Sequence, residues 1–169
     1  MKCLTSNEAL NICSNFLVER SESEKGSSLH LRSGDEFPLW GKFSQEHSKQ
    51  EFLMHWILDE TSNSGGHLVW LRDWNIFSKD GGLFEIIECF RKCYGETRKL
   101  SESPVFCFDP SEAYLAKDLV RILLGFDWGC YVIPLNGKAL VEFYDEDVAF
   151  WSFDEKIRDE LKPAIDWQS

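Results

Sequence analysis

The sequence lacks the short motifs that most directly indicate an enzyme. Neither glycine-rich phosphate-binding pattern, GxGxxG or GxxxxGK[ST], occurs in its 169 residues. It also has no HExxH or CxxC pattern for zinc, no EF-hand loop and no GxSxG turn around a nucleophilic serine. These absences exclude nucleotide binding through those loops. They also lead us to expect no catalytic residues, no metal site and no cofactor.

Positive charge and long hydrophobic runs are scarce as well. Lys and Arg number 18 against 29 Asp and Glu, which gives a formal net charge of −11. Nucleic acids and anionic membranes need clustered Lys and Arg, so neither is expected as a partner. No segment reaches about 18 uncharged apolar residues, and the N-terminus has no apolar leader pattern. We therefore expect a cytoplasmic protein, with a basic protein as its partner.

The cysteines show no spacing that predicts a disulfide framework. Most of the six lie in apolar segments, where a free thiol behaves as a small hydrophobic side chain. Cys89 and Cys93 are four residues apart in a predicted helix and are expected in the core. We predict that all six thiols are free: Cys3, Cys13, Cys89, Cys93, Cys107 and Cys130.

Apolar residues are plentiful enough for a folded core. Hydrophobic residues make up 43% of the sequence and aromatic residues 14%, so the chain is not a disordered acidic one. Its length fits one domain over residues 1–169. The polar tract over residues 19–28 has no apolar period and is predicted to be a mobile surface loop.

Apolar spacing and capping patterns predict the helices. Thr5-x-x-Glu8 is a capping box, and Asp109-Pro110-Ser111-Glu112 combines an N-cap residue, a first-turn proline and an acidic third position. The predicted helices cover residues 6–19, 49–60, 83–94, 109–124 and 154–161.

Three short β-rich runs predict a C-terminal antiparallel meander over residues 128–134, 139–144 and 148–152. Asn136-Gly137 separates the first two, and this pair is a strong hairpin signal. Further strands are predicted over residues 67–74 and 104–108, whereas Pro38 indicates an irregular segment over residues 37–40. The expected fold class is α+β, a mixed and mostly antiparallel sheet with helices on one face; α/β is the alternative.

Tryptophans beside carboxylates suggest a surface for a basic protein partner. Residues 142–160 hold eight acidic and two basic side chains, so their net charge is 2 − 8 = −6. Trp supplies rigid contact area and carboxylates orient a basic partner. A solvated helix face and ordinary core packing are the alternative interpretations. The candidate partner-binding residues are Asp145, Glu146, Asp147, Trp151, Asp127 and Trp74.

Three stretches, LVWLRDWNIF, FDPSEAYLAKDLVRILLGFDW and EFYDEDVAFWS, resemble a family of small soluble bacterial proteins of uncharacterised activity in the immunity and antitoxin-like class. The resemblance covers about residues 67–155 and rests on Trp, Asp and Pro positions. It implies a stoichiometric binder of a toxin or another protein, with no active site.

Three functions therefore remain open at this point. The first is a non-enzymatic binding protein of the immunity or inhibitor type. The second is a small metal-dependent or cysteine-dependent enzyme, which a polar pocket holding His, Cys or carboxylate groups would favour. The third is an adaptor domain for regulatory proteins.

Overall fold

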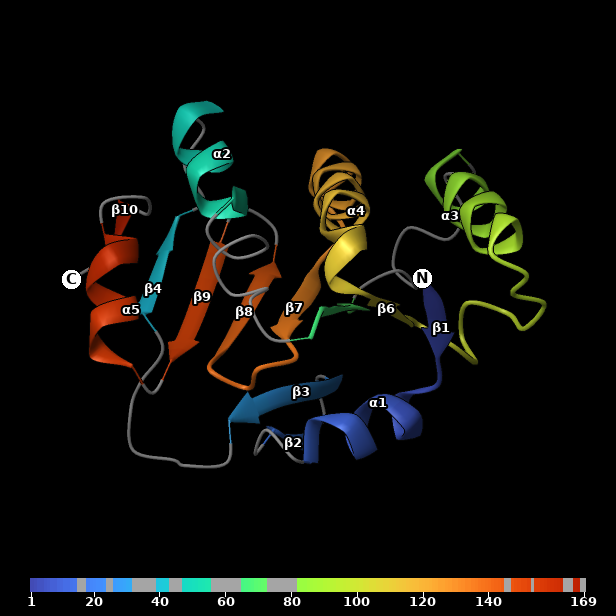
Figure 1. Ribbon diagram of the computed structural model, residues 1–169, viewed down its shortest axis with the longest axis horizontal. Coiled ribbons are helices and arrows are strands. Elements are labelled where there is room, and N and C mark those ends of the chain that lie inside the picture. Colours follow the sequence, from blue (N-terminus) through green and yellow to red (C-terminus); the bar gives the residue numbers. More distant parts are fainter. Residues whose placement is uncertain are drawn as a thin grey trace.

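In the computed structural model, an antiparallel sheet forms the centre of the folded protein (Figure 1). The structure describes residues 1–14, 18–23, 26–31, 39–42, 47–55, 65–72, 82–144, 147–152, 154–162 and 166–167. Among these residues, eight strands join in the order β1-β6-β5-β7-β8-β9-β4-β10, and every neighbouring pair is antiparallel. The strands are β1 (Lys2–Leu4), β4 (Leu39–Lys42), β5 (His67–Leu71), β6 (Val105–Phe108), β7 (Cys130–Pro134), β8 (Ala139–Tyr144), β9 (Asp147–Ser152) and β10 (Asp166–Trp167).

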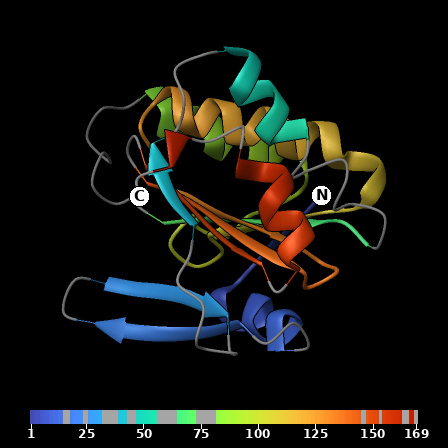
Figure 2. The ribbon, with the colours of Figure 1, turned by 90° about the vertical axis from the view of Figure 1, so that its left-hand side faces the viewer.

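Two different layers cover the two faces of this sheet. Figure 2 shows α2, α3, α4 and α5 on one side, which we call the helical face. On the other side, the hairpin face, lie α1 and a separate hairpin of β2 and β3. The bounds are α1 (Ser6–Ser14), β2 (Val18–Ser23), β3 (Gly26–Leu31), α2 (His47–His55), α3 (Gly82–Cys93), η2 (Pro110–Glu112), α4 (Ala113–Gly125) and α5 (Glu155–Leu161).

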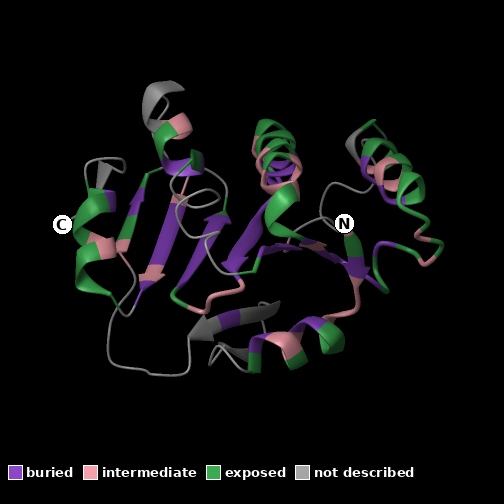
Figure 3. Cartoon of the chain, in the orientation of Figure 1, coloured by how far each residue is buried: buried purple, intermediate pink, exposed green. Residues whose placement is uncertain are grey.

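The central strands β5 and β7 are buried along their whole length (Figure 3). Alternate side chains of a strand point to opposite faces of a sheet. Val69 and Val132 accordingly belong to one apolar cluster with residues of α2, α3, α4 and α5. Leu68 and Ile133 belong to a second cluster with Ala9 and Cys13 of α1 and Leu29 of β3. The chain thus has one core on each face of the sheet.

The structure confirms the predicted α+β class, with its mostly antiparallel sheet and C-terminal meander. The order β7-β8-β9 is the predicted meander, and α2 to α5 form the predicted helical layer. Gly137 has φ 71 in the first turn, and its N–H donates to the carbonyl of Pro134 at 3.0 Å. Asn136 supports the turn through its side chain, which accepts the N–H of Lys138 at 3.0 Å. The turn chemistry therefore predicted this hairpin correctly.

The capping patterns also form as predicted. The side chain of Glu8 accepts the N–H of Thr5 at 2.6 Å, and Thr5 Oγ1 accepts the N–H of Glu8 at 3.1 Å. At the start of η2, Glu112 accepts the N–H of Asp109 at 3.0 Å. The first helix nevertheless ends at Ser14 rather than at residue 19, and β2 has begun by Val18.

The prediction of a loop is wrong for the described residues 19–23 and 26–28, because β2 and β3 pair there from Val18↔Leu31 to Ser23↔Gly26. This pairing is made by the backbone, and the polar side-chain pattern of the segment does not reveal it. Residues 24 and 25 lie outside the described part of the chain. The irregular segment predicted over residues 37–40 is also corrected, since Leu39 and Trp40 open β4 between β9 and β10. Residues 37 and 38 of the predicted segment lie outside the described residues.

Replacing Gly66 with alanine is expected to destabilise the fold by more than about 2 kcal/mol. Gly66 has φ 104, and a Cβ there would collide with the backbone carbonyl of Phe108. Urea unfolding would measure the loss. Gly125→Ala is the control, because a Cβ at Gly125 meets no atom within 4 Å. Equal midpoints for the two variants would contradict the described junction of β5 and β6.

Candidate functional site

The ends of β4, β8 and β9 gather aromatic and charged side chains on the hairpin face. The register aligns Lys42 with Asp147 and Asp147 with Tyr144, and it places Trp40 and Glu142 on either side of Ala149. Trp40 and Tyr144 are each 41% exposed. We call this group the aromatic–charged surface; its members are Trp40, Lys42, Arg72, Glu142, Tyr144 and Asp147.

Arg72 joins this surface from the end of β5. Its N–H donates to the carbonyl of Gly129 at 2.9 Å, which continues the pairing of β5 with β7. Its guanidinium carbon lies 4.5 Å from the ring centre of Tyr144 and 5.9 Å from that of Tyr131. The guanidinium also forms an ion pair with Glu142, whose side chain is 11% exposed. Stacking and ion pairing together hold Arg72 in one orientation.

A second ion pair fixes the outer part of the surface. Lys42 Nζ lies 2.8 Å from Asp147 Oδ1, between neighbouring strands. Because both side chains stand on paired strands, the sheet sets their separation. The aromatic–charged surface therefore presents exposed rings beside charges that are already paired.

The structure brings only some of the predicted partner-binding residues together. Asp147 belongs to the aromatic–charged surface, paired with Lys42. Trp151 lies on the same face of β9, half-buried against the hairpin-face core. Asp145, Glu146 and Trp74 lie outside the described residues.

Asp127 has a structural role that the sequence did not suggest. It is exposed and has φ 58, in the left-handed region directly after α4. Its N–H donates to Leu124 at 3.2 Å, and the N–H of Trp128 donates to Leu123 at 2.9 Å. This is the arrangement of a Schellman cap, which an Asp tolerates better than most non-glycine residues. Asp127 thus ends α4 and directs the buried Trp128 toward the core.

The acidic segment over residues 142–160 is less free than its net charge suggests. Among its described residues, ion pairs join Glu142 with Arg72, Asp147 with Lys42, Asp159 with Lys162 and Glu160 with Lys156. Asp154 caps α5 by accepting the N–H of Lys156 at 3.0 Å. Much of the negative charge of this segment therefore serves ion pairs and a helix cap within the protein.

Sequence reasoning did not assign Trp40, Lys42, Arg72, Glu142 or Tyr144 to a site. Strand alternation was the available signal, because Glu142, Tyr144 and Asp147 could have been placed on one face from the meander alone. Lys42 and Trp40 could not, since β4 pairs with β9 across more than a hundred residues of sequence.

The cysteines divide into buried and exposed groups, and all six are free thiols in the structure. Burial raises the pKa of the Cys3 and Cys107 thiols, and that of Cys13 to about 12. A thiol with a raised pKa is a poor nucleophile at neutral pH. Cys89 and Cys93 are exposed on α3, which corrects the prediction that they lie in the core. Within the part of the chain that is described, no three His, Cys, Asp or Glu side chains could together hold a metal.

A buried arginine organises the loop between α3 and β6. Arg91 has no exposed surface, and its guanidinium donates to the carbonyls of Arg98 at 3.0 Å and Lys99 at 3.2 Å. It also bonds to the side chains of Ser103 and Glu88. A buried charge is tolerated when it is paired and hydrogen-bonded in this way. Arg91 therefore holds the loop against α3.

The same loop is tied to the N-terminal elements by Arg98. Its guanidinium donates to the carbonyl of Cys3 in β1 at 2.8 Å and lies 3.5 Å from Glu8 of α1. Glu96 accepts hydrogen bonds from Arg98, and these bonds lower the pKa of its carboxyl to about 2. Arg98, which is paired with Glu96, thus links the loop between α3 and β6 to β1 and α1.

The chain matches no family model, no curated protein and no solved structure in three comparisons. Across the described residues, no helix has both the length and the apolar content needed to cross a membrane.

Breaking the Arg72–Glu142 pair is expected to destabilise the protein. Arg72→Met leaves the carboxylate of Glu142 without this cation in a mostly buried position, at a cost of about 1–3 kcal/mol. The double variant Arg72→Met with Glu142→Gln should be more stable than Arg72→Met alone, because the carboxylate is then neutral. Chemical unfolding of the four proteins in this cycle measures the coupling. Strictly additive losses would show that the pair contributes nothing.

Glu96→Gln should change the response of the protein to acid. The pKa of Glu96 lies at about 2, below its ordinary 4.5, so its stabilising contribution is present above pH 4.5 and is lost as pH falls toward 2. The variant lacks this contribution and should lose less stability over that range than the wild type. Thermal unfolding from pH 6 to pH 2 tests this expectation. Glu155→Gln is the control, since no ion pair of Glu155 occurs among the described residues; it should follow the wild type.

Proposed function

We propose that this protein is a non-enzymatic binding protein of the immunity or inhibitor type, and that its aromatic–charged surface docks a basic protein partner. The observation that carries the proposal is the exposure of Trp40 and Tyr144 on a paired sheet beside two fixed ion pairs. The proposal includes a cytoplasmic location, for which the apolar sequence surroundings of most cysteines argue.

Side chains of this kind favour protein partners. Trp, Tyr and Arg dominate the residues that carry binding energy in protein interfaces. Here Arg72 is held in place by Glu142 and the ring of Tyr144, and Trp40 is exposed on the same face of the sheet, two strands from β8. Because β4, β8 and β9 are paired in one sheet, little conformational freedom remains to be lost on binding.

Charge favours a basic partner. The net charge of the chain is −11, and Asp145 and Glu146 directly follow Tyr144 in the sequence. Lys42 and Arg72 are already paired with Asp147 and Glu142, so the surface keeps no unpaired cation of its own to attract an acidic protein. Carboxylates at the rim of an interface raise the association rate with a basic protein, and salt screens this effect over about 8 Å.

Tyr144→Ala is expected to weaken partner binding by about tenfold or more, as loss of an interface aromatic residue often does. The partner would first be recovered from the native host with the tagged protein, and its binding kinetics would then be measured with purified components. Asp145→Asn with Glu146→Gln should lower the association rate more than it raises the dissociation rate. Asp147 is left unchanged in this variant, because its loss would also break the pair with Lys42.

Tyr114→Ala is the matched control. Tyr114 is 63% exposed on α4, on the helical face, so the same substitution there should leave binding unchanged. Equal weakening by Tyr144→Ala and Tyr114→Ala, or a recovered partner that is itself acidic, would contradict the proposed surface.

A further inference from the structure

A cavity of about 570 Å³ lies between α3 and the loop that leads into β6. Cavities that bind small molecules in proteins span about 300–1,000 Å³ and combine apolar walls with a few polar groups. The lining residues that bear on its chemistry are Phe84, Glu85, Glu88, Lys92, Lys99 and Leu100. The cavity therefore has the size of a small-molecule site.

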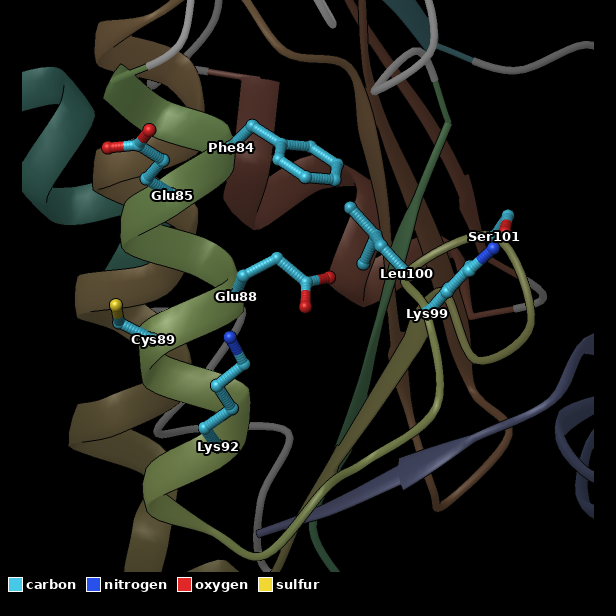
Figure 4. A pocket seen from close by; sticks show the side chains of 8 residues that line it. All are labelled: Phe84, Glu85, Glu88, Cys89, Lys92, Lys99, Leu100 and Ser101. Atoms are coloured by element: carbon cyan, nitrogen blue, oxygen red, sulfur yellow. The ribbon is translucent and has the colours of Figure 1, made fainter.

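Phe84 on α3 and Leu100 on the loop form the apolar part of the cavity. Figure 4 shows the ring of Phe84 extending from α3 toward Leu100. Leu100 is 1% exposed and belongs to the core of the helical face, and Phe84 packs against the same core. These two side chains suit a ligand that carries an aromatic ring.

The loop wall of the cavity is held in place by Arg91. This buried side chain of α3 donates hydrogen bonds to the carbonyl of Arg98 at 3.0 Å and to that of Lys99 at 3.2 Å. The loop is therefore fixed against α3 next to Leu100. A ligand would find a largely preformed site and would not have to order the loop.

The carboxylate of Glu88 points into the cavity from α3, toward Leu100 (Figure 4). Its Oε1 accepts a hydrogen bond from the buried guanidinium of Arg91, which fixes the position of the carboxylate. The Glu88 side chain keeps 21% of its surface exposed, and no hydrogen bond to its Oε2 occurs among the described residues. Oε2 is thus a positioned acceptor that a ligand can reach.

The charges around the cavity favour a neutral ligand. The Lys99 side chain extends away from α3 on the far side of Leu100, whereas Lys92 extends along α3 toward Glu88 (Figure 4). The carboxylate of Glu88 would repel an anionic ligand, and the cations of Arg91 and Lys92 would repel an ammonium group. A hydroxyl group avoids both repulsions and can donate a charge-assisted hydrogen bond to the carboxylate.

We propose that this cavity binds a small neutral phenol, with its ring between Phe84 and Leu100 and its O–H donating to Oε2 of Glu88. A hydrogen bond to a charged acceptor is stronger than one between neutral groups, so the hydroxyl group should set the specificity. The site lies on the helical face, separate from the aromatic–charged surface. It does not depend on the proposed function.

The probe for this site is 4-ethylphenol, and 4-ethylanisole is the matched ligand, because its methyl ether removes the O–H donor. Isothermal titration of the full chain should detect binding of 4-ethylphenol. The anisole should bind at least about fivefold more weakly, since the hydrogen bond to Glu88 is lost. The cation of 4-ethylbenzylamine should also bind more weakly than the phenol.

Glu88→Gln should weaken binding of 4-ethylphenol by about fivefold or more and leave binding of 4-ethylanisole unchanged. The amide keeps one oxygen for Arg91, but it removes the charged acceptor from the cavity. Glu85→Gln is the matched control, because it removes the same charge from the same helix. The Glu85 carboxylate is turned away from Leu100 in Figure 4, so this variant should bind the phenol as the wild type does.

Backbone amide signals in an NMR titration locate the bound probe. Those of Phe84, Glu88 and Leu100 should shift as 4-ethylphenol is added to the full chain, because these residues line the cavity. The amide signal of Tyr144, on the aromatic–charged surface, should stay in place.

Any of four results would overturn the site. These are no binding of 4-ethylphenol up to millimolar concentration, equal or tighter binding of the anisole or the amine, equal affinity of the wild type and Glu88→Gln for the phenol, and amide shifts confined to residues away from the cavity. If Glu88→Gln does not fold, the three ligands and the amide shifts still decide the question.

Discussion

The central strands β5 and β7 carry apolar side chains on both faces, and the rest of the structure depends on covering them. Each strand is paired on both sides within the sheet, so their backbone groups are satisfied, but neither face can remain in water. The helices α2 to α5 cover one face. The N-terminal α1 and the β2–β3 hairpin cover the other, which gives the polar N-terminal segment a structural reason to be ordered.

The aromatic–charged surface and the cavity beside α3 both lie where apolar packing gives way to charged or hydrogen-bonded contacts. On the hairpin face, the side chains of β4 and the outer ends of β8 and β9 are aromatic and charged, and Trp40 and Tyr144 keep much of their surface exposed. On the helical face, the contact between α3 and the following loop depends on the buried Arg91 and its carbonyl partners. The cavity lined by Phe84 and Leu100 lies between α3 and this loop.

Local signals were reliable where the chemistry of a few neighbouring residues decides the conformation. Thr5 and Glu8 form their capping box, and Asn136 with Gly137 forms the hairpin turn. Local signals gave wrong predictions where hydrogen bonding between backbone segments determines the conformation, as in β2 and β3. They also misled at Cys89, where an apolar helix pattern does not show which side of α3 faces the sheet.

The sequence by itself determined the α+β class, the meander, the helices and the acidic net charge, because these follow from composition, spacing and turn chemistry within short segments. Only the tertiary structure decided which distant side chains meet. The pairs Lys42–Asp147 and Arg72–Glu142 join strands separated by about seventy residues or more. The physical reason is that strand pairing brings together segments far apart in the chain. The order of strands in a sheet depends on the burial of the whole set, and no short segment contains that information.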